Sequence, residues 1–299
     1  MADDQENTGN FIFFGPDANC TLALCPVEWS VYKYRPSLVA NGIFIALYGI
    51  AMLVHIFLGI RWKSWFYMIM MICGCVTEII GYAGRIILHD NPWSFAGFMI
   101  QIVFITSGPV FYTAAIYVTL SKIIQSFAPE ISRIKPKVIW WIFIPADLVC
   151  LTLQAAGGAM STVSSGSSQT GIDVALAGLG LQVAVLVIFC VLLGDFLLRY
   201  FRSASAPSLS LRMRLFFGFL STAVILILGR CAFRCYELSE GYSNSDLITD
   251  QGLFIGLEGG LVAVAVFCLC VAHPGLVFND KLTQEKSQGS DAEVALEHK

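Results

Sequence analysis

Charged residues are scarce in this chain. Asp, Glu, Lys and Arg make up 13% of its 299 residues, while hydrophobic residues make up 57%. A soluble globular protein carries roughly 25% charged residues, so this chain has too few to cover a surface that faces water. The net charge of −3 includes no basic excess, and nucleic acid is therefore not an expected partner. The composition predicts a protein whose solvent is the lipid bilayer.

Several enzyme motifs are also missing from the sequence. It contains no GxxxxGK[ST] nucleotide loop, no GxSxG and, among its 4 histidines, no HxxxH or HExxH. A zinc hydrolase needs a cluster of such ligands. We therefore expect no enzymatic activity and no cofactor or metal. His55 and His273 lie in the first and last apolar segments and leave haem ligation open as an alternative.

Seven segments are apolar and long enough to cross a bilayer, which takes roughly 20 residues each. Because lipid cannot satisfy free backbone groups, each span must be helical. The sequence thus predicts an all-α bundle of seven transmembrane helices over 38–278, after an N-terminal segment (1–37) without a cleavable signal and before a polar, disordered tail (279–299). The expected spans are 38–60, 65–88, 95–120, 138–160, 172–198, 215–237 and 252–273.

Lysine and arginine alternate between the two sides of this bundle. Thirteen of them fall in the loops after spans one, three and five and in the C-terminal tail. Only Lys33 and Arg35 fall on the other side. Cytoplasmic loops carry the excess of Lys and Arg, so the N-terminus is expected outside the cytoplasm and the C-terminus inside.

The N-terminal segment carries two features of an extracytoplasmic chain. Cys20 and Cys25 lie in a polar stretch, where a disulfide would form if the segment is outside. Asn19, Cys20 and Thr21 form an N-glycosylation acceptor. The other eight cysteines lie inside apolar runs and are expected to act as small apolar residues.

Polar side chains inside the predicted spans indicate a structural or functional role, because ionisable groups are costly in hydrocarbon. With the predicted topology, they fall at one depth, between the midplane and the outer leaflet. We call this set the polar layer. It consists of Glu78, Tyr82, Arg85, Gln101, Asp147, Gln154, Gln182, Arg230, Arg234, Glu237 and Glu258.

Helical spacing gives further expectations for these groups. Glu78, Tyr82 and Arg85 share one helix face, but Glu78 and Arg85 lie roughly 10 Å apart along the axis, so each needs a partner from another helix. Pro109 and Pro145 should kink their helices. Gly252, Gly256 and Gly260 repeat every four residues, a spacing that predicts close helix packing.

Two interpretations of the polar layer stay open. Its members can form buried ion pairs and hydrogen bonds that hold the bundle together. They can also line a cavity that receives a polar headgroup, with apolar walls around the lipid chain. Four acids against three arginines suit a zwitterionic or cationic amphiphile.

Many of these residues carry a resemblance to a known family. The residues concerned are Tyr34, Pro36, Ser37, Leu38, Asn41, Glu78, Gly81, Tyr82, Arg85, Gln101, Pro109, Ala114, Ala115, Tyr117, Asp147, Gln154, Gly157, Gly158, Gly178, Gln182, Arg230, Arg234, Glu237, Gly241, Glu258, His273, Pro274 and Gly275. Over 34–278 the chain resembles the RTA-like family of fungal seven-span lipid-translocating exporters. One departure is visible, since Gln251 follows Asp250 where the family usually opens the seventh span with an acid.

The resemblance implies export of amphiphilic lipids or resistance to them: sphingoid long-chain bases, toxic sterol analogues or porphyrins. It also implies the plasma membrane or internal membranes. Its partners are then membrane lipids, with the oligomeric state left open. Glu78, Asp147 and Glu258 are expected to face the headgroup, with the arginines balancing charge and the glutamines donating hydrogen bonds.

A lipid receptor or sensor without transport is the competing interpretation. Its topology would be the same. Against it, the inner loops are short, and the D-R-Y and N-P-x-x-Y motifs of seven-span receptors are missing.

Overall fold

The computed structural model describes Ile12, Gly15 and residues 18–127, 135–163, 169–202, 211–239 and 249–276. Seven helices in these ranges are long and apolar enough to cross a membrane, which confirms the predicted fold class. The first six are α1 (Leu38–Trp62), α2 (Trp65–Asp90), α3 (Phe95–Phe127), α4 (Pro136–Val163), α5 (Gln169–Arg202) and α6 (Leu211–Ser239). The seventh span combines α8 (Gln251–Leu253), the π-helix η2 (Phe254–Gly260) and α9 (Leu261–Val271). The chain is a multi-pass membrane protein.

The first six helices extend a few residues beyond their predicted spans, whereas the helical part of the seventh runs from Gln251 to Val271. Helix α1 begins at Leu38 because Ser37 is its N-cap, with the Ser37 hydroxyl accepting from the amide of Ala40. Asp250 caps α8 in the same way, accepting from the amides of Gly252 and Leu253. Asp250 is therefore the acid that opens the seventh span, and its carboxylate is occupied as the N-cap of that helix. Hydropathy detects only the apolar part of each helix, so the polar turns at the ends were not predicted.

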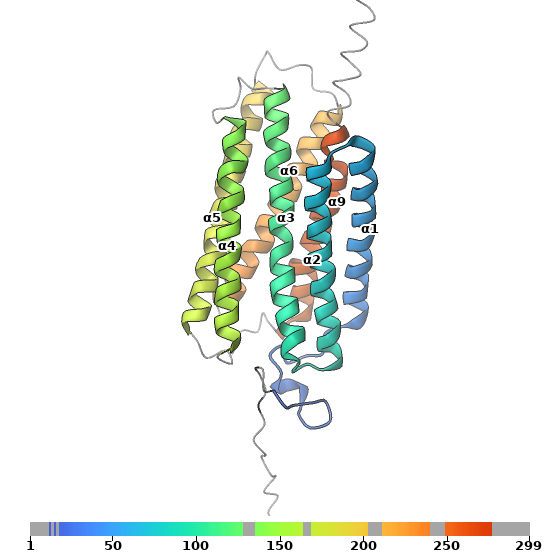
Figure 1. Ribbon diagram of the computed structural model, residues 1–299, viewed down its shortest axis with the longest axis vertical. Helices are drawn as coiled ribbons and strands as arrows, with labels where there is room; N and C mark the ends of the chain where they lie inside the picture. The colour runs from blue at the N-terminus through green and yellow to red at the C-terminus, as the bar shows by residue number, and fades with distance from the viewer. Residues whose placement is uncertain are drawn as a thin grey trace, which may run out of the picture.

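The helices run along one long axis, with α1 and α2 on one side of the bundle and α4 and α5 on the other (Figure 1). Helix α3 contacts α2, α4 and α6, and α9 contacts α6 and α1. Large apolar side chains such as Val39, Phe57 and Val191 are exposed on the outer surface. Lipid is the solvent that such a surface requires.

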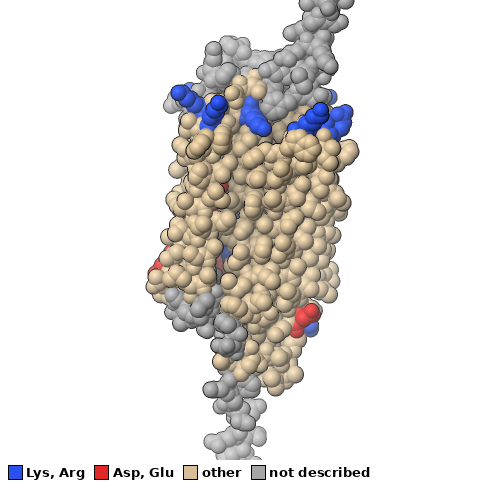
Figure 2. Space-filling view, in the orientation of Figure 1, with Lys and Arg blue, Asp and Glu red and all other residues tan. Residues whose placement is uncertain are grey.

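The two ends of the bundle differ in charge. Lysine and arginine side chains form a band at one end, and the face between the ends is largely uncharged (Figure 2). The N-terminal segment lies at the opposite end (Figure 1). We call the end with the N-terminal segment the outer end and the basic one the inner end, following the orientation predicted from the sequence. Arg133, the tail 279–299 and its three lysines lie outside the described residues.

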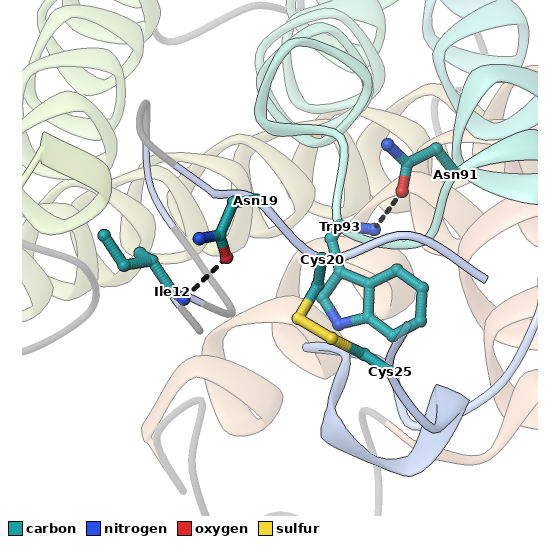
Figure 3. The surroundings of a disulfide bond; sticks show 6 residues. All are labelled: Ile12, Asn19, Cys20, Cys25, Asn91 and Trp93. Atoms are coloured by element: carbon teal, nitrogen blue, oxygen red, sulfur yellow. Dashed lines mark hydrogen bonds between the residues drawn. A yellow bond between two sulfur atoms is a disulfide. The ribbon is translucent and has the colours of Figure 1, made fainter. Parts of the chain in front are cut away.

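The N-terminal segment is linked internally by a disulfide and is hydrogen-bonded to the bundle. Cys20 and Cys25 form a disulfide, with their Cα atoms 5.6 Å apart, and it packs against the buried Trp93 between α2 and α3 (Figure 3). The side-chain oxygen Oδ1 of Asn19 accepts from the backbone amide of Ile12. Arg35 donates to the carbonyl of His89 at 2.6 Å, near the C-terminal end of α2. The segment therefore covers the outer end of α2 and α3.

The π-helix η2 changes the packing of the seventh span. The prediction that Gly252, Gly256 and Gly260 make the close approach is wrong, because a Cβ at Gly256 would meet no atom within 4 Å. Gly259 makes it instead, since a Cβ there would meet Phe44 at 2.5 Å and the Tyr82 hydroxyl at 2.7 Å. A π-helix has i→i+5 bonds, which rotate the following residues off the face that a four-residue repeat predicts.

Candidate functional site

Four charged residues of the polar layer form a continuous group between α6 and η2. Nη2 of Arg230 lies 2.9 Å from Oε1 of Glu258, and both side chains are buried, with exposed fractions of 0% and 3%. Nη1 of Arg234 lies 2.6 Å from Oε2 of Glu237 and 3.8 Å from Oε2 of Glu258. Each charge thus has an opposite charge beside it, as a low-dielectric interior demands.

A proline supplies Arg230 with another partner. Nη2 of Arg230 donates to the carbonyl of Ile105 at 3.2 Å. In a regular helix that carbonyl would accept from the residue four positions later, which is Pro109 and has no N–H. Pro109 therefore frees an acceptor in α3 that the guanidinium of α6 takes. The sequence predicted that Pro109 would kink α3, but not that Arg230 would bind the Ile105 carbonyl.

Glu78 and Tyr82 lie on the same buried face of α2, as predicted. Oε1 of Glu78 points at Gly108 on α3, where a Cβ would collide with the carboxylate, and it has no hydrogen-bond partner. The Tyr82 ring stacks on Phe44 with centroids 4.8 Å apart, and its hydroxyl faces Gly259. Both residues are enclosed by neighbouring helices.

Arg85 is surrounded by aromatic rings. Nη2 of Arg85 donates to the Tyr34 hydroxyl at 2.9 Å, and its guanidinium carbon lies 3.6 Å from the centroid of Phe254 and 5.4 Å from that of Tyr32. Among the described residues it forms no ion pair. Cation–π contacts of this kind are worth roughly 0.5–2 kcal/mol each. The partners come from the N-terminal segment and from η2.

Tyr32 also satisfies a second member of the polar layer. Nε2 of Gln101 donates to its hydroxyl at 2.8 Å. Burial raises the pKa of Tyr32 well above its usual value, against the opposing positive charge of Arg85, so the phenol stays neutral. The N-terminal segment therefore closes the outer end of the polar layer with two tyrosines that the sequence did not predict as site residues.

Asp147 lies apart from this charged group, between α3 and α4. Its Oδ2 accepts from the Thr113 hydroxyl at 2.8 Å, and the Tyr117 hydroxyl lies beside the same carboxylate. The side chain is buried, with an exposed fraction of 1%. Further outward, Nε2 of Gln154 on α4 donates to Oε1 of Gln182 on α5 at 2.8 Å, leaving Oε1 of Gln154 without a partner.

Two cavities open beside these residues. The outer cavity, of about 320 Å³, lies between α3, α4, α5 and α6, and its polar wall includes Gln154 and Arg234. The inner cavity, of about 760 Å³, lies between α2, α3 and α4 and extends from Lys122 and Lys137 to Asp147. Both volumes fall in the range of about 300–1,000 Å³ typical of ligand sites. A hollow on the front face of the bundle exposes acidic and basic atoms at mid-depth (Figure 2).

The polar layer therefore divides into two groups. Asp147, Gln154 and Arg234 line these two cavities. The other members are enclosed between helices, or by the N-terminal segment, and line neither of them. They are Glu78, Tyr82, Arg85, Gln101, Gln182, Arg230, Glu237 and Glu258.

The two histidines considered for haem are held by their surroundings. Nε2 of His273 lies 3.2 Å from the Ser64 hydroxyl, and its Nδ1 accepts from the amide of Gly275. His55 is buried beside the Cys270 thiol, with Nε2 and Sγ 3.3 Å apart. Within the described part of the chain, no group of three or more His, Cys, Asp or Glu side chains is placed to hold a metal ion.

The family model described as RTA1 like protein matches residues 71–281. The chain is 32% identical over 285 residues to the sphingoid long-chain base transporter RSB1 of Saccharomyces cerevisiae, covering 83% of this chain and 74% of that protein. It is 24% identical over 264 residues to the probable lipid transporter atnI of Emericella nidulans, covering 83% and 68%.

A third relative is protein RTM1 of Saccharomyces cerevisiae, 25% identical over 209 residues, covering 69% of this chain and 67% of that protein. No solved structure gives a significant match. Because the family model covers most of the membrane region, the chain belongs to the RTA1-like protein family.

Proposed function

We propose that this protein exports amphiphilic lipids, with sphingoid long-chain bases as the substrate class, and that it moves them without changing them chemically. The observation that carries the proposal is the 32% identity to a sphingoid long-chain base transporter over 83% of the chain. The plasma membrane is the proposed location. Resistance to lipids or to toxic amphiphiles would follow from export.

The cavities suit the chemistry of such a substrate. A long-chain base combines an ammonium group and hydroxyls with an alkyl chain. Asp147 offers the ammonium group a buried carboxylate that has no cationic partner among the described residues, in a cavity whose remaining walls are mostly apolar. Gln154 lines the outer cavity, and its Oε1 accepts no hydrogen bond from the described residues. A buried carboxylate that meets a cation gains a charge-assisted hydrogen bond, and without a cation it remains costly.

We assign the enclosed members of the polar layer to support of this site. The pairing of Arg230 with Glu258 joins α6 to the seventh span, and the contact of Glu78 with Gly108 fixes α2 against α3. A transporter needs such fixed elements around the groups that contact its substrate. Asp147 then meets the ammonium group, and Gln154 and Arg234 meet the hydroxyls of the headgroup.

The test is a flux assay with purified protein reconstituted in proteoliposomes and a labelled sphingoid base. Asp147→Asn keeps the size of the side chain and removes its charge. Because it loses a charge-assisted contact with the ammonium group, we expect base flux to fall roughly tenfold or more. Asp195→Asn is the matched control, since Asp195 is part-exposed at the inner end beside Arg199 and should leave flux unchanged.

Two results would contradict the proposal. One is the absence of flux above protein-free vesicles for the wild type. The other is saturable binding of the base without any flux, which would instead indicate a lipid receptor. Equal flux for Asp147→Asn and wild type would remove Asp147 from the headgroup site.

A further inference from the structure

The two cavities meet along one seam between α3 and α4. The α4 wall of the inner cavity ends at Asp147, Leu148 and Leu151, and the α4 wall of the outer cavity begins at Leu151 and continues to Gln154. Leu151 is thus a wall residue of both cavities. Helix α3 runs in the opposite direction, so its earlier residue Ser107 lines the outer cavity and its later residue Val110 lines the inner one.

Resting on the proposed function, we propose that the two cavities are halves of one lateral route for the lipid headgroup. In this route Asp147 receives the ammonium group on the inner side, and Leu151 is the constriction that separates it from Gln154 on the outer side. The residues Asp147, Leu151 and Gln154 follow one another at spacings of four and three, so they lie on one face of α4. On this face Asp147 contacts Thr113 of α3, and Gln154 contacts Gln182 of α5.

The charges along the seam favour a cation at Asp147. Lys122 and Lys137 line the inner cavity at its rim, but Lys137 lies ten residues before Asp147 on α4, roughly 15 Å along the axis. Among the described residues neither rim lysine pairs with Asp147, whose buried carboxylate meets only the hydroxyls of Thr113 and Tyr117. An ammonium group that enters from the inner side therefore finds its counter-ion at mid-depth.

The seam also lets the alkyl chain remain in lipid. Trp141 and Leu148 line the inner cavity and are exposed on the outer surface of the bundle. Only the polar headgroup is costly in hydrocarbon, so only the headgroup needs polar partners on its way across. Thr106, Ser107 and Thr152 add hydroxyls to the outer cavity, beyond Leu151. The route thus needs no closed channel.

The experiment enlarges the constriction residue and compares it with a neighbour that faces lipid. In the proteoliposome assay, Leu151→Trp should block the seam and lower flux of the sphingoid base roughly tenfold or more. Val149→Trp is the matched control, because Val149 is 51% exposed and lines neither cavity. We expect its flux to stay within roughly twofold of wild type.

A second variant and a second readout keep the test independent of folding. Leu151→Ala opens the constriction and should leave flux equal to or above wild type. A photoactivatable sphingoid base should crosslink to residues of α3 and α4 that line the cavities. If wild type transports the base while Leu151→Trp and Val149→Trp behave alike, or if the crosslinks lie on residues that line neither cavity, the route is wrong and the proposed function stands. If wild type does not transport the base, the proposed function and the route fall together.

Discussion

At the scale of single residues, the charges between α6 and the seventh span are held by fixed partners. The guanidinium of Arg230 is fully buried, and it is balanced by Glu258 and by the Ile105 carbonyl that Pro109 leaves free. Removing one member of such a pair leaves the other charge buried and uncompensated, which costs more than the pair itself contributes. The two carboxylates Glu258 and Asp147 therefore should respond differently to neutralisation.

Glu258→Gln should destabilise the folded bundle. It leaves Arg230 without its counter-ion in the interior, and a loss of about 3–5 kcal/mol is expected. The measurement is unfolding by SDS in mixed micelles, followed by circular dichroism. Asp195→Asn is the control, because its pair with Arg199 is part-exposed and such pairs contribute about 0–1 kcal/mol. Equal stabilities for the two variants would show that the buried pair does not hold α6 to the seventh span.

At the scale of elements, the seventh span differs from the other six. Phe254–Gly260 is a π-helix that places Phe254 against Arg85 and Glu258 against Arg230. The apolar pattern predicted this span and its ends within a few residues. It did not predict the π-helix, because hydropathy does not distinguish i→i+4 from i→i+5 bonding. The four-residue glycine repeat therefore indicated the wrong packing face.

Two glycines of this π-helix give a matched pair of variants. Gly259→Ala forces a methyl group against Phe44 and the Tyr82 hydroxyl, and should destabilise the bundle by about 1–3 kcal/mol. Gly256→Ala meets no atom within 4 Å, and it should be neutral or stabilising by up to about 1 kcal/mol. SDS unfolding of both proteins measures the difference. A larger loss for Gly256→Ala than for Gly259→Ala would contradict the observed packing.

The N-terminal segment is the element whose role was hardest to predict from sequence. Tyr32 and Tyr34 lie in an irregular stretch without helical periodicity, so no pattern relates them to residues of α2 and α3. Helical spacing predicted that Arg85 needs a partner from another element, and the structure provides Tyr34 and the ring of Phe254. The need for a partner follows from burial, whereas its identity depends on how the segment folds back over the bundle.

At the scale of the whole molecule, topology predicts the depth of each polar residue but not its direction. The sequence predicts both Glu78 and Asp147 as members of the polar layer. Asp147 lines the inner cavity, while Glu78 is enclosed between α2 and α3 at Gly108. Depth follows from chain order and helix rise alone, whereas the direction depends on how each helix is rotated against its neighbours. The candidate headgroup site could therefore be narrowed from eleven residues to three only with the structure.

The orientation of the bundle is a prediction that the whole molecule allows to be tested. Its basic band lies at the end opposite the N-terminal segment, where the sequence predicts the cytoplasm (Figure 2). An epitope added at the N-terminus should therefore bind antibody on intact cells, and one added at the C-terminus should bind only after permeabilisation. A cytosolic protein stained in parallel controls for leaky cells. If the N-terminal epitope is protected in intact cells and the C-terminal one is exposed, the bundle is inverted. Asp147 would then face the opposite leaflet from the one from which export begins.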